Sequence, residues 1–217
     1  MSLLCPQRLT ELFDSSISND FLRDTLHCLF AAYQEAWLYC QSSFPPSEAH
    51  DLYPVERRAR FERSWREVAL LHGLDAQAIV NKSRNAWHTE VRSGAVVLTA
   101  AAAPTPNTII RRAEYRRTLA RSNQGYLFGP PFGPKEPEPG DRLYGIVLHG
   151  PDGVFRNRPG FVEVVFPDPS LTTYVGRVNL LARYPETASQ IEVPVERIPE
   201  DLSLRLRGSV ARRREQA

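Results

Sequence analysis

The hydrophobic pattern changes its period once along this chain, and that change limits the folds available to it. From Asn19 to about Gln41, apolar residues recur every three or four positions, which is typical of a helix with one buried face. A second helix is predicted from near Pro54 to Gly73, and a shorter one from Asp75 to about Arg84. From Trp87 onward, apolar residues alternate or form short runs, as they do in strands. The sequence therefore predicts an α+β fold.

A stretch rich in proline and glycine, residues 125–141, divides the second half of the chain. Before it we expect a hairpin at Trp87–Ala102 that turns at Ser93-Gly94, and a basic helix from Asn107 to about Ser122. After it, five short runs predict a small antiparallel sheet, sandwich or barrel, namely Leu143–Leu148, Phe161–Phe166, Tyr174–Ala182, Ile191–Val195 and Leu202–Leu206. We expect an N-terminal helical unit at 1–124, a connector at 125–141 and a β-rich unit with a basic tail at 142–217. It stays open whether the two units share one core.

Composition excludes several classes of protein. The chain has 217 residues, of which 42% are hydrophobic, so it can bury a core. It has no apolar run long enough to cross a membrane and no secretory signal at its start, so we expect a cytoplasmic protein without a membrane partner. Cys28 and Cys40 lie on one predicted helix about 18 Å apart, too far for a disulfide, and Cys5 stands alone.

Arginine dominates the cationic residues. Of the 27 basic side chains, all but Lys82 and Lys135 are arginine. A GC-rich, bacterial-like genome would explain this bias. Guanidinium groups also bind phosphates and carboxylates in a bidentate manner that lysine cannot match. The total charge of +2 does not distinguish these two explanations.

The charge is unevenly distributed, and one segment is locally basic. Residues 87–124 hold six basic and two acidic side chains, and most of the basic ones fall on the predicted basic helix. The candidate anion-binding residues are Arg111, Arg112, Arg116, Arg117 and Arg121. At 100° per residue, Arg112 and Arg116 share one flank of that helix and the last two share another. The alternative is that they are ordinary surface cations paired with acids inside the protein.

One pair of residues suggests catalysis instead. His88 and Glu90 are two apart on a predicted strand and therefore share a face. Together with His149 they are the candidate residues of a hydrolytic centre, with or without a metal ion. Ordinary polar residues on a solvent-facing strand would give the same pattern. A nuclease would need clustered acids with a nearby lysine, and Asp152 and Glu163 have none. Motifs for zinc deaminases, zinc proteases, serine hydrolases and nucleotide-binding loops are missing from the sequence, so we expect no cofactor and no metal.

The sequence thus favours a non-catalytic binding or accessory module. It would engage nucleic acid or an acidic protein surface through the arginine-rich helix. The alternatives are the hydrolytic enzyme centred on His88 and Glu90, and a structural or assembly protein without a local site.

Overall fold

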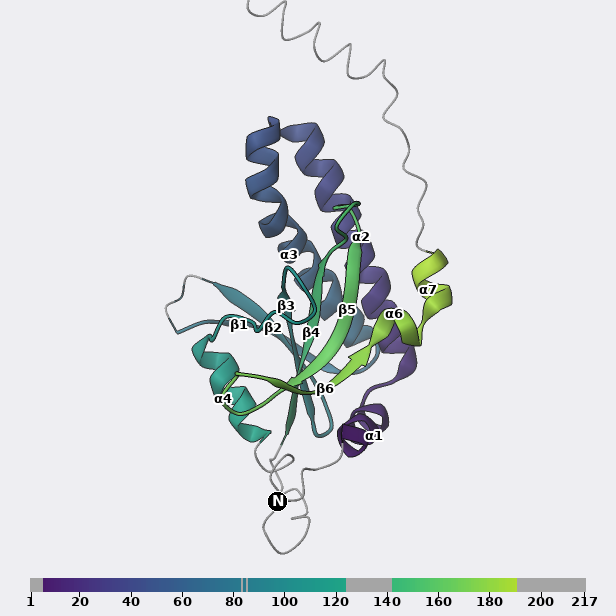
Figure 1. Cartoon of the computed structure of the whole chain (residues 1–217), viewed down its shortest axis with the longest axis vertical. Coiled ribbons are helices and arrows are strands. Elements are labelled where there is room, and N and C mark those ends of the chain that lie inside the picture. The colour runs from purple at the N-terminus through teal and green to yellow at the C-terminus, as the bar shows by residue number, and fades with distance from the viewer. Residues whose placement is uncertain (1–5, 83, 85, 124–141, 191–217) are drawn as a thin grey trace, which may run out of the picture.

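The computed structural model describes residues 6–82, 84, 86–123 and 142–190. In this part of the chain, helices surround one six-stranded sheet (Figure 1). The helices are α1 (Pro6–Ser16), α2 (Asn19–Ser43), α3 (Pro46–Leu71), α4 (Glu114–Ser122), α6 (Leu180–Arg183) and α7 (Pro185–Gln190). The strands are β1 (Asp75–Val80), β2 (Trp87–Ser93), β3 (Val96–Ala102), β4 (Leu143–Pro151), β5 (Pro159–Pro167) and β6 (Tyr174–Asn179). The α+β prediction is confirmed.

The sheet is open and mixed. Its strands follow the chain in order from β1 to β6, and every neighbouring pair is antiparallel except β3 and β4, which are parallel. Parallel neighbours need a crossover, and α4 lies within the segment that connects them. The predicted hairpin and the predicted C-terminal strands β4 to β6 therefore belong to one sheet.

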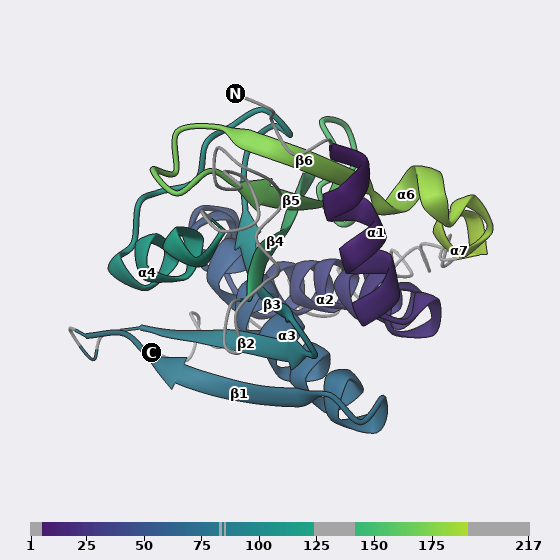
Figure 2. The same ribbon diagram turned by 90° about the horizontal axis from the view of Figure 1, so that it is seen from below.

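Each face of the sheet has its own apolar core. The larger core packs α1, α2 and α3 against one face, and its largest fully buried side chains include Trp65, Tyr33, Phe13, Phe21 and Phe61. The smaller core packs Ala120 of α4 against Tyr144, Ile146 and Leu148 of β4 on the other face. Figure 2 shows β3 and β4 between α4 and α2. This three-layer order explains why β4 is buried along almost its whole length.

The two long helices form largely as predicted. Helix α2 has the predicted bounds within two residues, although Ser18 rather than Asn19 caps it by accepting a hydrogen bond from the Phe21 amide. Helix α3 begins eight residues earlier than expected, at Pro46. Proline is well tolerated in a first helical turn, where its missing N–H has no partner to lose. Pro54 then lies inside the helix on an exposed side, where water can reach the carbonyl that it leaves unpaired.

Three local predictions are wrong. The strand expected at Tyr174–Ala182 ends at Asn179, because the Asn179 side chain accepts a hydrogen bond from the Ala182 amide and caps helix α6 there. The expected helix at Asp75–Arg84 is instead β1 and the turn that follows it, because Asp75–Val80 pairs residue by residue with β2. The expected basic helix from Asn107 begins only at Glu114. The Tyr174 hydroxyl donates to the Thr108 carbonyl and accepts from the Ile110 amide, so these two backbone groups are bonded to β6 and not to helical partners.

Several predictions lie outside the described residues. These are the connector at 125–141, the last two predicted strands, the basic tail Arg212–Arg214, Lys135 and Cys5. Of the other cysteines, Cys40 is buried and Cys28 half-buried, and both thiols are free. Burial raises the pKa of the Cys28 thiol to about 11, so the thiol stays protonated and a poor nucleophile at neutral pH.

Candidate anion-binding site

The site originates in a split between two neighbouring strands. Strands β2 and β3 pair only where Val91–Ser93 faces Val96–Leu98. Toward its start, from Trp87 to Glu90, β2 pairs with β1 alone, and the end of β3 pairs with β4 alone. The two strands therefore part, and the opening between them is bordered by α3 and by the segment that leads into α4. A split of this kind brings side chains from several elements around one hollow.

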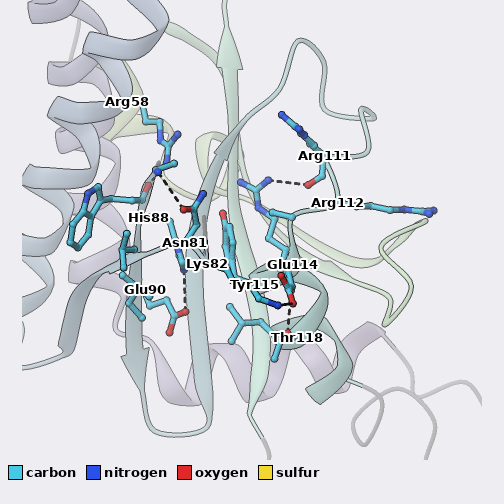
Figure 3. A pocket seen from close by; sticks show the side chains of 17 residues that line it. Arg58, Asn81, Lys82, His88, Glu90, Arg111, Arg112, Glu114, Tyr115 and Thr118 are labelled. Atoms are coloured by element: carbon cyan, nitrogen blue, oxygen red, sulfur yellow. Dashed lines mark hydrogen bonds and ion pairs between the residues drawn. The ribbon is translucent and has the colours of Figure 1, made fainter. Parts of the chain in front are cut away.

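The larger hollow, which we call the outer cleft, has a volume of about 740 Å³. It lies between the β1–β2 hairpin and α4 (Figure 3). Five cationic side chains line it, together with only two acidic ones, Glu90 and Glu114. The cations are Arg58, Lys82, Arg111, Arg112 and Arg116. The walls of the outer cleft therefore carry an excess of positive charge.

A smaller hollow of about 260 Å³, the inner cavity, adjoins the outer cleft. Three arginines, Arg58, Arg111 and Arg116, line both hollows. The inner cavity is also lined by Arg57 and Glu62 from α3, by the end of β3 and by His149 from β4. It thus reaches through the split toward the helices on the other face of the sheet.

Unpaired polar atoms concentrate in these two hollows. Among the residues that the structure describes, three buried side-chain atoms have no hydrogen-bond partner: Nε of Arg57, Nδ1 of His88 and Nε of Arg116. All three residues line the outer cleft or the inner cavity. Buried polar groups are almost always paired, and each exception calls for an explanation such as a bound ligand or water. These three unpaired atoms therefore leave hydrogen-bonding positions at the two hollows that a ligand or ordered water can fill.

His88 and Glu90 form the predicted pair. Nε2 of His88 lies 3.3 Å from Oε1 of Glu90, and Arg92 binds the other oxygen of that carboxylate at 2.9 Å. The hydrogen bond from His88, together with the charge of Arg92, lowers the pKa of Glu90. The imidazole also stacks on the Tyr115 ring, with 3.7 Å between the ring centroids. Both members of the pair are buried rather than solvent-facing, with His88 only 3% exposed.

His149 is not brought to that pair. Its Nδ1 lies 3.0 Å from the Tyr33 hydroxyl, and its ring packs on Phe61 at the inner cavity, whereas His88 and Glu90 line the outer cleft. The structure therefore does not place the three residues in one pocket, and a centre of His88 and Glu90 alone stays a prediction. In the described part of the chain, no group of three metal-ligating side chains is placed to hold an ion.

The burial of His149 predicts a loss of stability in mild acid. Burial and, next, the charge of Arg57 lower its pKa from 6.5 to about 3, so the folded protein holds a neutral ring where the unfolded chain would protonate. The contribution of neutral His149 to the free energy of unfolding is complete above about pH 6.5, and it falls by about 1.4 kcal/mol per pH unit below that. Urea unfolding between about pH 7 and about pH 5 should show this slope, and His149→Gln should flatten it. An equal slope in both proteins would contradict the prediction.

The five candidate arginines occupy two structural contexts. Arg111 and Arg112 precede α4, and Arg116 lies on it with Nη1 donating to the Arg111 carbonyl at 3.1 Å. Arg117 and Arg121 share the exposed side of α4, where they border a third hollow of about 320 Å³ together with Arg112. Arg112 therefore links the outer cleft with this outer face of α4, instead of sharing one helical flank with Arg116.

None of these five arginines forms an ion pair with an acid in the described residues. Two arginines of α3 behave differently, since half-buried Arg60 and exposed Arg63 bind glutamates one helical turn away. In the described part of the chain, these arginines therefore lie at the surface without internal acidic partners, and their binding of an anion stays a prediction. Their charge remains available to a partner.

Other residues of the site were not singled out from the sequence. Arg57 and Arg58 belong to α3, and nothing in the local pattern distinguishes them from the other arginines there. Two aromatic residues, in contrast, are candidates from the sequence as surfaces on which bases stack. Trp87 lines the outer cleft and is 59% exposed, whereas Tyr144 is fully buried and cannot stack on a ligand. Comparisons with protein families, curated proteins and solved structures find no match to this chain. None of the described helices is both long and apolar enough to span a membrane.

Proposed function

We propose that this protein is a non-catalytic module that binds nucleic acid at the outer cleft and along the exposed side of α4. The observation that carries the proposal is the excess of arginines without acidic partners around a cleft that also contains orphaned buried nitrogens. Guanidinium groups bind phosphate oxygens in pairs and keep their charge at any physiological pH. A phosphate would supply the missing acceptors.

The extent of the positive surface favours a polymer over a small ion. Cations begin at Arg58 in the outer cleft, continue through Arg112, and end with Arg121 on the far side of α4. A single small anion would occupy only one of these hollows. A strand with phosphates at regular spacing would contact several, and each such contact releases counterions.

An exposed aromatic ring favours a single strand over a duplex. Trp87 presents its indole at the outer cleft beside the cations. Unpaired bases stack on such rings, whereas the bases of a duplex are already stacked on one another. Trp87→Ala should weaken single-strand binding by about 10-fold and leave the salt dependence unchanged, because the ring carries no charge. Fluorescence anisotropy with a labelled oligonucleotide measures both, and an unchanged affinity would exclude stacking.

The direct test is a binding titration at two salt concentrations. Short single- and double-stranded DNA and RNA are titrated at about 50 and about 200 mM salt, with poly-glutamate as the acidic-protein probe. We expect single strands to bind at the lower salt and to lose about 10-fold or more in affinity at the higher salt. Binding of poly-glutamate alone would assign an acidic protein partner instead. Binding that salt does not affect would contradict the proposal.

A further inference from the structure

The inner cavity holds a buried cation that lacks a counterion. Arg57 is 6% exposed, and its guanidinium lies over the rings of Tyr33 and Tyr53, with Cζ 4.3 and 5.2 Å from their centroids. No acid in the described residues forms an ion pair with it, and its Nε has no hydrogen-bond partner. A buried charge without a partner is costly, and π contacts compensate only part of that cost. A ligand that supplies negative charge would complete the site.

The other charged side chains of the inner cavity are three cations and one acid. Arg58, Arg111 and Arg116 line it, and Nε of Arg116 is the second orphaned atom there. The one acid is Glu62, and its carboxylate is already engaged by Arg58 at 2.9 Å and by the Thr89 hydroxyl at 3.1 Å. Burial and, next, the charge of Arg57 hold the pKa of His149 low, so its ring is neutral and adds no charge to the cavity. The cavity therefore suits an anion with more than one charge.

The depth of Arg57 restricts which phosphate can reach it. A phosphate inside a strand carries a nucleoside on both sides and lies along the surface of its binding protein. A terminal phosphate has one substituent, enters a cavity end-on, and carries a charge of about −1.5 to −2 at neutral pH. We infer that the inner cavity binds a phosphomonoester, as carried by the phosphorylated end of a nucleic-acid strand lying in the outer cleft. The nucleic-acid part of this inference rests on the proposed function.

The test compares one oligonucleotide sequence with a 5′-phosphate, a 3′-phosphate, or hydroxyls at both ends. We expect one of the phosphorylated forms to bind about 10- to 100-fold more tightly than the hydroxyl form, because buried charge-assisted hydrogen bonds form only with it. Arg57→Gln should bring that ratio close to one. Arg116→Gln, at a less buried position of the same cavity, should lower the ratio too, which covers the case in which the first variant fails to fold. Arg60→Gln, on the same helix but outside the cavity, should leave the ratio of the two affinities unchanged.

Inorganic phosphate separates this inference from the proposed function. Millimolar phosphate should raise the Tm of the wild-type protein and of Arg60→Gln, but not that of Arg57→Gln or Arg116→Gln. Equal binding of all three oligonucleotides, without such a rise in Tm, overturns the inference while leaving nucleic-acid binding intact. If no oligonucleotide binds but phosphate raises the Tm in this pattern, the proposed function is wrong and the cavity takes a small phosphomonoester. If neither effect occurs, both are wrong.

Discussion

Reversing the charge of Arg112 and Arg116 together should reduce nucleic-acid affinity by about 100-fold or more at low salt. Arg116 lines both hollows, and Arg112 joins the outer cleft to the exposed side of α4, so the double variant places negative charge at the two junctions of the positive surface. Loss of two phosphate contacts should also lower the slope of log affinity against log salt by about 1.4 for a single strand. Anisotropy titrations across a salt series measure both quantities.

The matched control reverses the same amount of charge elsewhere. Arg23 is half-buried and Arg63 is exposed, and both pair with acids on their own helices and do not line the hollows of the site. Arg23→Glu with Arg63→Glu should therefore change affinity far less than Arg112→Glu with Arg116→Glu, because only long-range electrostatics is altered. Equal losses in the two double variants would show that net charge, and not this surface, governs binding. Circular dichroism establishes that all variants are folded.

Asn123→Leu should lower the free energy of unfolding by about 2 to 5 kcal/mol. Asn123 is fully buried just after α4, and its Nδ2 donates to the carbonyls of Tyr144 and Pro167 at 3.0 and 2.9 Å. Its Oδ1 accepts from the Tyr144 amide at 2.6 Å. Leucine keeps the approximate volume but leaves these buried backbone groups without that partner. Urea unfolding measures the change.

The same substitution connects stability to the site. Asn123 joins the end of α4 to β4 and β5, so its loss loosens the helix that carries Arg116, Arg117 and Arg121. Asn107→Leu, at an exposed position of the same connecting segment, serves as the control and should change stability by less than about 0.5 kcal/mol. A loss below about 1 kcal/mol for Asn123→Leu would show that water replaces the amide.

Patterns confined to one element were predictable from the sequence. The repeat of apolar residues along α2, the hairpin of β2 and β3, and the buried runs of β4 and β5 each follow from the need to bury one face or one whole strand. The basic segment before and within α4 could also be found from the sequence, because charged residues can be counted along the chain.

Pairing between distant segments decided the rest. Asp75–Val80 has no strong strand pattern and becomes a strand because β2 lies beside it. Residues 108–110 stay out of a helix because Tyr174, more than sixty positions later, binds their backbone. Neither partner can be inferred from the local period of hydrophobic residues.

The candidate site shows the same division. The sequence by itself determined the five arginines around α4 and the spacing that pairs His88 with Glu90 on one strand face. Only the tertiary structure decided that β2 and β3 part, that Arg57 and Arg58 of α3 lie around one cavity with Arg111 and Arg116, and that His149 lies apart from His88 and Glu90. The physical reason is that local periodicity follows from burial within one element, whereas a cavity forms from contacts between elements that are far apart in the chain.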